Sequence, residues 1–355
     1  MPVFSELSFA DRVLFVIIFS TVCLLGMSAL FAVIAIMLRG RNALEVRRGA
    51  SFEGQWKEEI VSFFSNTKSM DKLITQISRK EIFYFLDYVL RIAERVAGQE
   101  HNTLCRFARP FLGRVLERTK ARSAEVRARA IHMLGIFDPK RHFRVIVSAL
   151  DDPAPFVAMI AARMLVRPDH PEYARFVLER LHRFQSWDRR FLSAVLAAGG
   201  TAIAHDLKIF LADDLRTPFV RVVCAEALRK LNDLGAADIA ADVIRSAKDR
   251  DLIASCLRLL RQVGRRDHLE LVRSLYSSHD FVIRAHAVGA IGRLGGQVDV
   301  EILKKAFEDG SMWVAIQAAI GLRELGAENV LKDIIGSNHP RSKLAEQVLS
   351  EAAHS

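Results

Sequence analysis

The sequence predicts an all-α protein in which one N-terminal transmembrane helix precedes an α-α superhelix, a solenoid of about seven repeats. Two observations predict this fold class. Residues 13–38 contain no charged side chain, and from residue 123 onward one apolar pattern returns every 31 or 32 residues. The first observation indicates a span across a bilayer. The second indicates helices that stack as repeats.

The composition indicates a folded chain with a large core and an anionic neighbour. The 355 residues are 51% hydrophobic, which excludes a disordered chain. Lys and Arg outnumber Asp and Glu by 51 to 41, and this excess favours a phospholipid surface, an acidic protein or nucleic acid. Cys23, Cys105, Cys224 and Cys256 lie far apart in the sequence. This spacing favours a reducing compartment over a disulfide scaffold or a zinc ribbon.

The N-terminal segments are predicted to anchor the chain in a membrane. We expect a short extracytoplasmic N-terminus over residues 1–12, a transmembrane signal-anchor helix over residues 13–38 and a basic juxtamembrane linker over residues 39–50. A helix of that length spans roughly 39 Å, which exceeds the roughly 30 Å of a bilayer core. The apolar run is also about twice as long as that of a cleaved signal peptide.

Basic residues near the two ends of the span predict its orientation. Only Arg12 precedes the apolar run, whereas Arg39, Arg41, Arg47 and Arg48 follow it. Basic residues stay on the cytoplasmic side of a span. We therefore expect a single-pass protein of a bacterial inner membrane, with its N-terminus outside and its repeats in the cytoplasm. The four arginines after the span are expected to contact anionic lipid.

The repeats begin at positions that step evenly along the chain. A small residue stands four positions after each start in every copy but one, and a branched apolar residue stands eight positions after it. Such an i, i+4, i+8 face predicts a helix that packs against the next repeat, and a second amphipathic stretch completes a helical hairpin. The starts are Val126, Val157, Asp188, Val220, Leu252, Ile283 and Val314.

The repeats are expected to have a cap at each end and a glycine after each first helix. Residues 51–122 are predicted to form a helical N-terminal cap or divergent repeats, and residues 123–355 the regular repeats with a C-terminal capping helix. Gly264, Gly295 and Gly326 share one offset from their repeat starts. This position suggests that each adopts the left-handed conformation that ends a helix.

The repeated pattern can be written Val-Arg-x-x-Ala-x-x-Ala-Leu-Gly-x-Leu-Gly. It resembles HEAT repeats of the short bacterial type, also called phycobilisome-lyase-like repeats, over about two thirds of the chain. The resemblance implies a scaffold fold whose members include some phycobilin lyases and a few DNA-repair enzymes. It also implies that the second helices line the concave side. Asp188 and Leu192 depart from the pattern, so we expect a local distortion in the third repeat.

No motif in the sequence indicates catalysis, and we expect no enzyme activity, no cofactor and no metal. The chain lacks His-Glu-x-x-His, a phosphate-binding glycine loop and Gly-x-Ser-x-Gly. His101 and Cys105 stand one helical turn apart, but a metal site needs more than two ligands. Cys224 and Cys256 occupy the small-residue column, where a thiol packs as a compact apolar group.

Basic residues recur directly after the repeat starts. We expect a structural ladder in which each guanidinium donates to carbonyls or carboxylates of the adjoining turn. The alternative is a recognition stripe. These residues are Arg127, Arg189, Arg221 and Arg284.

A second set of basic residues lies on the second helices of the repeats. If these helices line the concave side, the set forms a basic groove that binds an acidic partner. The alternative is a solvated face. The set consists of Arg144, Arg175, Arg180, Arg183, Lys208, Arg245, Arg273 and Lys304.

The span and the repeats together predict a membrane-tethered protein-protein interaction scaffold. It would recruit or regulate a membrane-associated protein partner at the cytoplasmic face, for example a glycosyltransferase of an exopolysaccharide or envelope assembly. One alternative, implied by the resemblance, is a lyase-like protein that binds a tetrapyrrole. The other is a nucleic-acid-binding solenoid. Scarce aromatic residues on the second helices argue against base stacking, so nucleic acid is not the expected partner.

Overall fold

The chain divides into two helical units, Met1–Gly113 and Arg114–Ser355. The structure is a computed structural model that describes residues 9–64, 74–75, 77–337 and 339–352, and no strand occurs among these residues. The unit boundary falls ahead of residue 123, where the regular repeats were expected to start. The all-helical fold class is confirmed.

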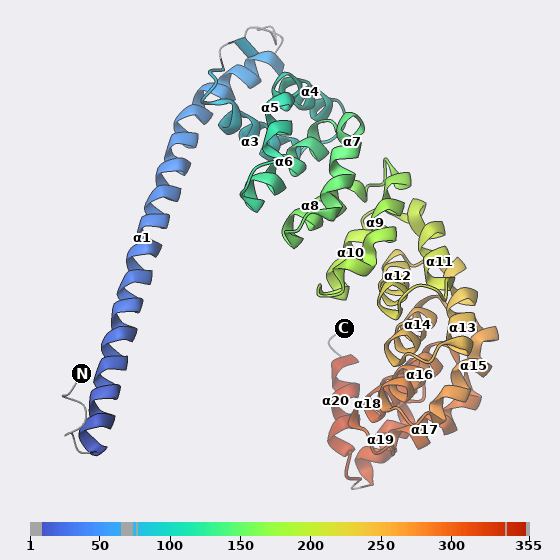
Figure 1. Cartoon of the computed structure of the whole chain (residues 1–355). Helices are drawn as coiled ribbons and strands as arrows, with labels where there is room; N and C mark the ends of the chain where they lie inside the picture. Colours follow the sequence, from blue (N-terminus) through green and yellow to red (C-terminus); the bar gives the residue numbers. More distant parts are fainter. Residues whose placement is uncertain (1–8, 65–73, 76, 338, 353–355) are drawn as a thin grey trace. The chain divides into compact units, whose positions relative to one another are not determined.

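The first unit contains one long helix, α1 (Phe9–Phe64) (Figure 1). Its segment Ile17–Met37 is long and apolar enough to cross a bilayer, and none of it is buried against the described protein. A signal sequence near an N-terminus has the same properties. The helix also continues through residues 39–50, which were expected to be a linker. No proline interrupts that stretch, so the backbone hydrogen bonds of the helix can run on unbroken.

The C-terminal part of α1 packs against a small cluster of helices. Trp56 of α1 lies 5.5 Å, ring to ring, from Phe85 of α3 (Ile82–Ala93), and Phe85 lies 5.9 Å from Phe111. All three rings are largely buried, and such edge-on aromatic pairs add to the burial of apolar area. Helix α4 (Gly98–Ala108) packs against α3 and completes the cluster. These residues correspond to the expected N-terminal cap.

The second unit begins with α5 (Leu112–Arg118), which starts just before the boundary, and continues as a stack of helical pairs (Figure 1). In each pair the first helix begins near a predicted repeat start. The first helices are α6 (Ala124–Phe137), α8 (Pro155–Leu165), α10 (Arg189–Ala197), α12 (Pro218–Leu231), α14 (Arg250–Val263), α16 (Phe281–Leu294) and α18 (Met312–Glu324). The second helices are α7 (Pro139–Ser148), α9 (Ala174–Arg180), α11 (Ala204–Ala212), α13 (Ala237–Ser246), α15 (Leu269–Ser274), α17 (Val300–Phe307) and α19 (Glu328–Gly336). Helix α20 (Ser342–Ala352) follows the last pair.

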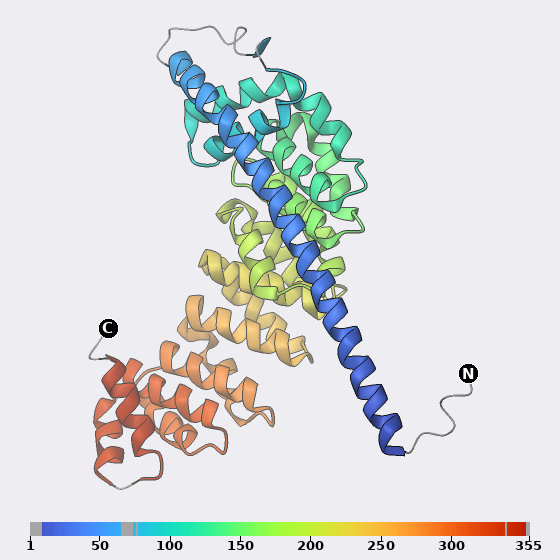
Figure 2. The same ribbon diagram turned by 90° about the vertical axis from the view of Figure 1, so that its left-hand side faces the viewer.

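The helices of this unit form two layers. The first helices of neighbouring repeats pack side by side as an inner layer, and the second helices form an outer layer (Figures 1 and 2). The first helices contact one another more extensively than the second helices do. Small residues on the first helices permit this close approach. We infer that the stack bends toward the inner layer because neighbouring helices lie closer together there than in the outer layer.

The core of the second unit lies where the sequence predicted it. Every residue eight positions after a repeat start is at most 1% exposed: Leu134, Leu165, Leu196, Leu228, Leu260, Ile291 and Leu322. The residues four positions after the starts are buried as well, including Cys224 and Cys256. Burial raises the pKa of both thiols to about 12, so they pack as apolar groups, as expected.

The glycines after the first helices do not all serve the purpose that was expected. Gly326 has a left-handed φ of 72°, whereas Gly264 and Gly295 have φ values of −65° and −76°. At these two positions glycine is required for space. A Cβ on Gly264 would lie 2.4 Å from the Leu260 carbonyl oxygen, and one on Gly295 would lie 2.6 Å from that of Ile291.

The third repeat departs from the others at its start, as expected. Asp188 caps α10, since its side chain accepts a hydrogen bond from the Phe191 amide at 2.8 Å. Helix α10 therefore begins one residue after its repeat start, whereas α12 begins two residues before its own; α10 has 9 residues and α12 has 14. The start residue that packs inside other repeats is a surface cap in this one.

Candidate functional site

Arginines that follow the repeat starts stabilise the turns between repeats. Arg127 donates from Nε and Nη2 to the Asp152 carboxylate, both at 2.8 Å, and from Nη1 to two backbone carbonyls of the preceding turn. Arg284 makes the same contacts with Asp309, at 2.8 and 2.9 Å. Arg221 donates to a carbonyl of α11 at 2.9 Å. The structural ladder is confirmed for these three arginines.

The carboxylates of this ladder are held in their ionised form. The hydrogen bond from Arg127 lowers the pKa of Asp152, and the one from Arg284 lowers the pKa of Asp309. Each carboxylate also accepts a backbone amide two residues later. These arginines and aspartates are therefore fully used within the fold, and they are not available to a ligand.

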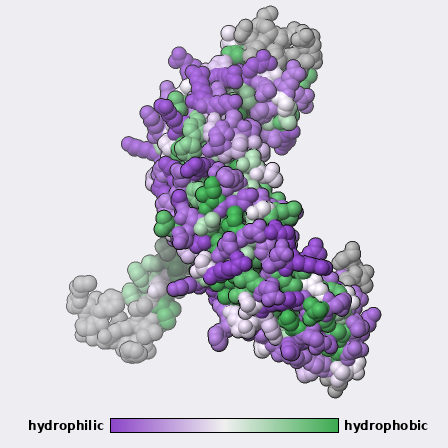
Figure 3. Space-filling view, turned by 90° about the vertical axis from the view of Figure 1, so that its right-hand side faces the viewer, coloured by the Kyte–Doolittle hydropathy of each residue, from purple (hydrophilic) through white to green (hydrophobic). Residues whose placement is uncertain are grey.

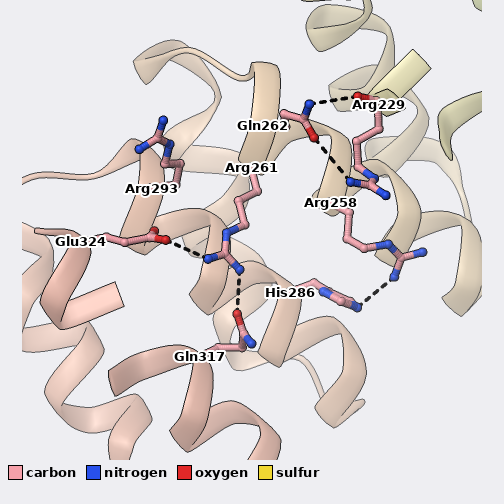
Figure 4. Close-up of a pocket in the computed structure, with 8 residues that line it drawn as sticks. All are labelled: Arg229, Arg258, Arg261, Gln262, His286, Arg293, Gln317 and Glu324. Carbon is pink, nitrogen blue, oxygen red and sulfur yellow. Dashed lines mark hydrogen bonds and ion pairs between the residues drawn. The ribbon is translucent and has the colours of Figure 1, made fainter. Parts of the chain in front are cut away.

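A groove crosses the inner layer over helices α10, α12, α14, α16 and α18. It consists of two adjoining cavities of about 820 and 430 Å³ that share Arg229, Arg258 and His286. Figure 4 shows the smaller cavity, whose side chains come from four successive first helices. We call these two cavities together the inner groove.

Positive charge dominates the inner groove. Seven cationic and three acidic side chains line it, and Trp187 is the only Phe, Tyr or Trp among the described lining residues. The cations are Arg189, Arg190, Arg229, Lys230, Arg258, Arg261 and Arg293, and the acids are Asp188, Glu226 and Glu324. The groove can thus attract an anionic group but has little surface for stacking a flat ring.

A buried ionic network forms the floor of the inner groove. Glu226 accepts hydrogen bonds from Arg229 at 3.0 Å and from Arg258 at 2.8 Å. Although burial by itself would raise the pKa of Glu226, the two guanidiniums outweigh it and the pKa is lowered. Arg258 also lies 3.0 Å from Nε2 of His286. Burial, followed by the charge of Arg258, lowers the pKa of His286 to about 4, so this ring accepts from Arg258 in its neutral form.

Arg261 reaches across an entire helix of the inner groove. It starts on α14, passes α16, and donates to Gln317 at 2.8 Å and to Glu324 at 3.0 Å on α18 (Figure 4). Gly289 of α16 lies beneath it. A Cβ there would lie 2.7 Å from Oε1 of Gln317 and 2.9 Å from Nη1 of Arg261. The absent side chain at this position therefore makes room for the contact.

Arg189 makes a similar contact at the other end of the inner groove. It starts on α10, passes α12, and donates to Asp251 of α14 at 2.8 Å. Its guanidinium also lies 5.9 Å from the ring of Phe219. Arg189 thus departs from the ladder expected for its position. It is the first residue of its helix, whereas Arg127, Arg221 and Arg284 are the fourth residues of theirs.

The cationic side chains of three further residues of the inner groove make no hydrogen bond or ion pair with the described part of the chain. They are Arg190, Lys230 and Arg293, on α10, α12 and α16. Arg293 extends at the rim of the smaller cavity in Figure 4. These side chains are available to a ligand.

The eight basic residues that the sequence singled out lie in or beside the outer layer. The expectation that second helices line the concave side is thus wrong for this chain, because small residues draw the first helices closer together. Seven of the eight form ion pairs: Arg175–Glu179, Arg180–Asp151, Arg183–Asp151, Lys208–Asp233, Arg245–Asp242, Arg273–Asp299 and Lys304–Glu301. Arg144 is exposed on α7. Partner binding by this set stays a prediction.

The outer layer offers a less distinct surface than the inner groove. Figure 3 views the molecule from the side of the second helices and shows a mostly hydrophilic surface with small hydrophobic patches. The acidic partners of the basic residues lie on the same surface, so its charges largely compensate one another.

The inner groove does have a signal in the sequence, which the sequence analysis did not use. Several of its polar lining residues stand three or six positions after the start of a repeat, as Glu226, Arg258 and His286 do.

The remaining expected sites are the arginines after the apolar segment and the pair His101 and Cys105, and the structure describes the arginines only in part. Arg39 lies on α1 just after the apolar segment, whereas the side chains of Arg41, Arg47 and Arg48 lie outside the described residues. Their contact with lipid stays a prediction. Nε2 of His101 lies 3.4 Å from Sγ of Cys105. No group of three metal-ligating side chains occurs within the described ranges.

Comparisons with known proteins identify the repeats. The family model of HEAT repeats matches residues 112–197 and 237–323. These segments include the ladder arginines Arg127 and Arg284 and most helices of the inner groove. No curated protein matches the sequence.

Several solved structures are similar to the chain at low identity. The complex of CpcE and CpcF of phycocyanin lyase from Nostoc sp. PCC7120 is 16% identical, with 68% of this chain and 87% of that chain covered and a TM-score of 0.34. Two engineered proteins are 14% and 15% identical. They cover 79% and 67% of this chain and 98% and 95% of their own, with TM-scores of 0.33 and 0.25. Similarity at this level does not transfer an activity.

Proposed function

Because this chain is a HEAT-repeat protein, we propose that it is a membrane-tethered scaffold that holds a protein partner in its inner groove. HEAT repeats build extended surfaces suited to protein binding. The observation that carries the proposal is the excess of cations along the groove, three of them without a partner in the described structure. With Trp187 as the only Phe, Tyr or Trp among its described lining residues, the groove favours neither a tetrapyrrole nor stacked bases.

The proposed tether is the apolar part of α1. No part of the segment Ile17–Met37 is buried in the described structure, and the segment is long enough to span a bilayer. Arg39 and the arginines after it favour the orientation in which the repeats lie in the cytoplasm, in a bacterium beneath the inner membrane. Confinement to the membrane raises the effective concentration of a partner held there. Full extraction of the chain from membranes by alkaline carbonate would contradict the tether.

The proposed role is binding rather than catalysis. The titratable groups in the floor of the inner groove, Glu226, Arg258 and His286, are occupied by one another, which supports this. Our narrower proposal is that the partner is a glycosyltransferase of an exopolysaccharide or envelope assembly, because the tether restricts partners to proteins at the membrane. Unchanged surface polysaccharide after deletion of the gene would contradict this narrower proposal.

Site-specific crosslinking in intact cells tests the scaffold proposal. A photoreactive amino acid replaces Lys230 in the inner groove, or Glu301 in the outer layer as the control. We expect a partner to crosslink from position 230 only, and Arg293→Glu to abolish the product. Crosslinking from position 301 alone would contradict the assignment to the inner groove.

A further inference from the structure

The cations of the inner groove differ in how firmly they are held. Arg258 is engaged by Glu226, whose side chain is only 13% exposed. Arg261 and its partner Glu324 are 32% and 25% exposed. Ion pairs that reach water contribute little net attraction, so another carboxylate can replace one member. Arg261 therefore binds the carboxylate of Glu324 now, but it can bind another anion in its place.

Glu324, the acidic partner of Arg261, lies at an unfavourable position for a negative charge. It is the last residue of α18, where the negative end of the helix dipole repels a carboxylate. Its contact with Arg261 crosses the groove over Gly289. Gln317, the other acceptor of Arg261, is neutral and can remain in place when Glu324 leaves. Asp251, by contrast, lies in the first turn of α14, where the dipole favours it.

The length of the inner groove indicates the form of the ligand. Five first helices line it. Packed helices lie about 8 to 10 Å apart, so the groove spans roughly 35 Å. An extended peptide advances about 3.3 Å per residue, and about ten residues cover that distance. The unpaired cations Arg190, Lys230 and Arg293 are distributed along this line.

We propose that the inner groove takes an extended acidic segment of about ten residues from the protein partner, and that one of its carboxylates replaces Glu324 on Arg261. Arg190, Lys230 and Arg293 attract the segment first because they have no carboxylate to exchange. Glu324 then acts as an internal competitor that weakens binding of poorly matched ligands. This inference rests on the proposed function and names the chemistry of the partner.

A peptide titration with the full chain in detergent tests the ligand class. The probe is a fluorescent twelve-residue peptide of alternating Glu and Ser, with a Gln and Ser peptide and a four-residue Glu and Ser peptide as comparisons. We expect binding of the long acidic probe only. Arg293→Glu should weaken it about tenfold, and Arg245→Glu in the outer layer should leave it unchanged. Equal binding of the Gln peptide would overturn the inference, as would tighter binding of a single-stranded oligonucleotide.

A charge-matched pair of variants tests the exchange at Arg261. Glu324→Gln removes the internal competitor, and Glu301→Gln removes the same charge from the outer layer, where Glu301 pairs with Lys304. We expect Glu324→Gln to tighten the acidic probe about two- to fivefold, the range of an exposed ion pair, relative to Glu301→Gln. Equal affinities would overturn the exchange.

The outcomes separate this inference from the proposed function. If crosslinking from position 230 succeeds but the acidic probe does not bind, the scaffold proposal stands and the acidic segment is wrong. If crosslinking fails while the probe binds as expected, the groove recognises acidic chains but the scaffold proposal fails. Melting temperatures of all variants, followed by circular dichroism, verify that they fold.

Discussion

Helices α16 and α18 touch through their backbones at Gly292 and Gly321, and this contact supports a quantitative prediction. A Cβ added to Gly292 would lie 2.4 Å from the Cα of Gly321, whereas ordinary contacts lie at 3.4 to 4 Å. A backbone atom cannot rotate away as a flexible side chain does. Gly292→Ala therefore forces the two helices apart by about 1 Å and loosens the packing around the contact.

The size of the effect follows from two opposing contributions. Alanine favours a helix over glycine by about 1 kcal/mol, while overpacking a close contact costs about 1 to 3 kcal/mol. Because the obstacle at Gly292 is backbone, we expect the upper part of that range and a net destabilisation of about 1 to 2 kcal/mol. For a unit of this size the melting temperature should fall by about 3 to 6 °C.

Two other glycines provide matched controls. At Gly321 an added Cβ would lie 3.1 Å from both the Cα of Gly292 and a methyl of Leu303, so Gly321→Ala should cost less. At Gly113 in α5 nothing lies within 4 Å, and Gly113→Ala should be neutral or slightly stabilising. The assay is thermal denaturation of the full chain in detergent, followed by circular dichroism. A Gly292→Ala chain that melts at or above the wild-type temperature would refute the reasoning.

Two further predictions concern charges of the second unit. Arg284→Lys should lose the two-pronged contact with Asp309 and cost about 1 to 2 kcal/mol in urea denaturation, while Arg245→Lys at an exposed pair should cost almost nothing. The pKa of His286, about 4 in the fold against 6.5 ordinarily, means that the unfolded chain binds more protons between these values. For a fully buried ring this difference would correspond to about 3 kcal/mol. Because the ring is partly exposed to solvent, we expect His286 to lower stability by about 2 kcal/mol as the pH drops through this window. His286→Gln should abolish most of this loss, and His205→Gln, at an exposed position, should retain it; equal pH profiles would contradict the assignment.

The repeats could be predicted because the residues that pack each one lie within a short stretch of sequence. The columns that contain Leu228 and Cys224 are set by the pitch of a helix, and every member is buried as expected. The contacts of Arg127 and Arg284 were also predictable, since each involves only the adjoining turn and the next repeat. At residues 39–50 the basic residues suggested a linker, but the helix α1 continues through them.

The inner groove could not be predicted in the same way, because it depends on how successive repeats turn relative to one another. Whether the first or the second helices face inward depends on small differences in spacing that add up along the stack. The contact of Arg261 with Glu324 joins residues 63 positions apart and requires a glycine at position 289 between them. Neither residue shows a periodic signal that connects it to the other.

The sequence by itself determined that this chain is a helical repeat protein with an apolar helix near its N-terminus, which residues fill its core, and that it carries excess positive charge. These properties follow from helical periodicity and composition, which are local. Only the tertiary structure decided where the charge gathers, since ion pairs neutralise most of the outer layer while Arg190, Lys230 and Arg293 stay unpaired within the described structure. The reason is that an ion pair depends on the distance in space between two charged side chains, which often belong to different repeats.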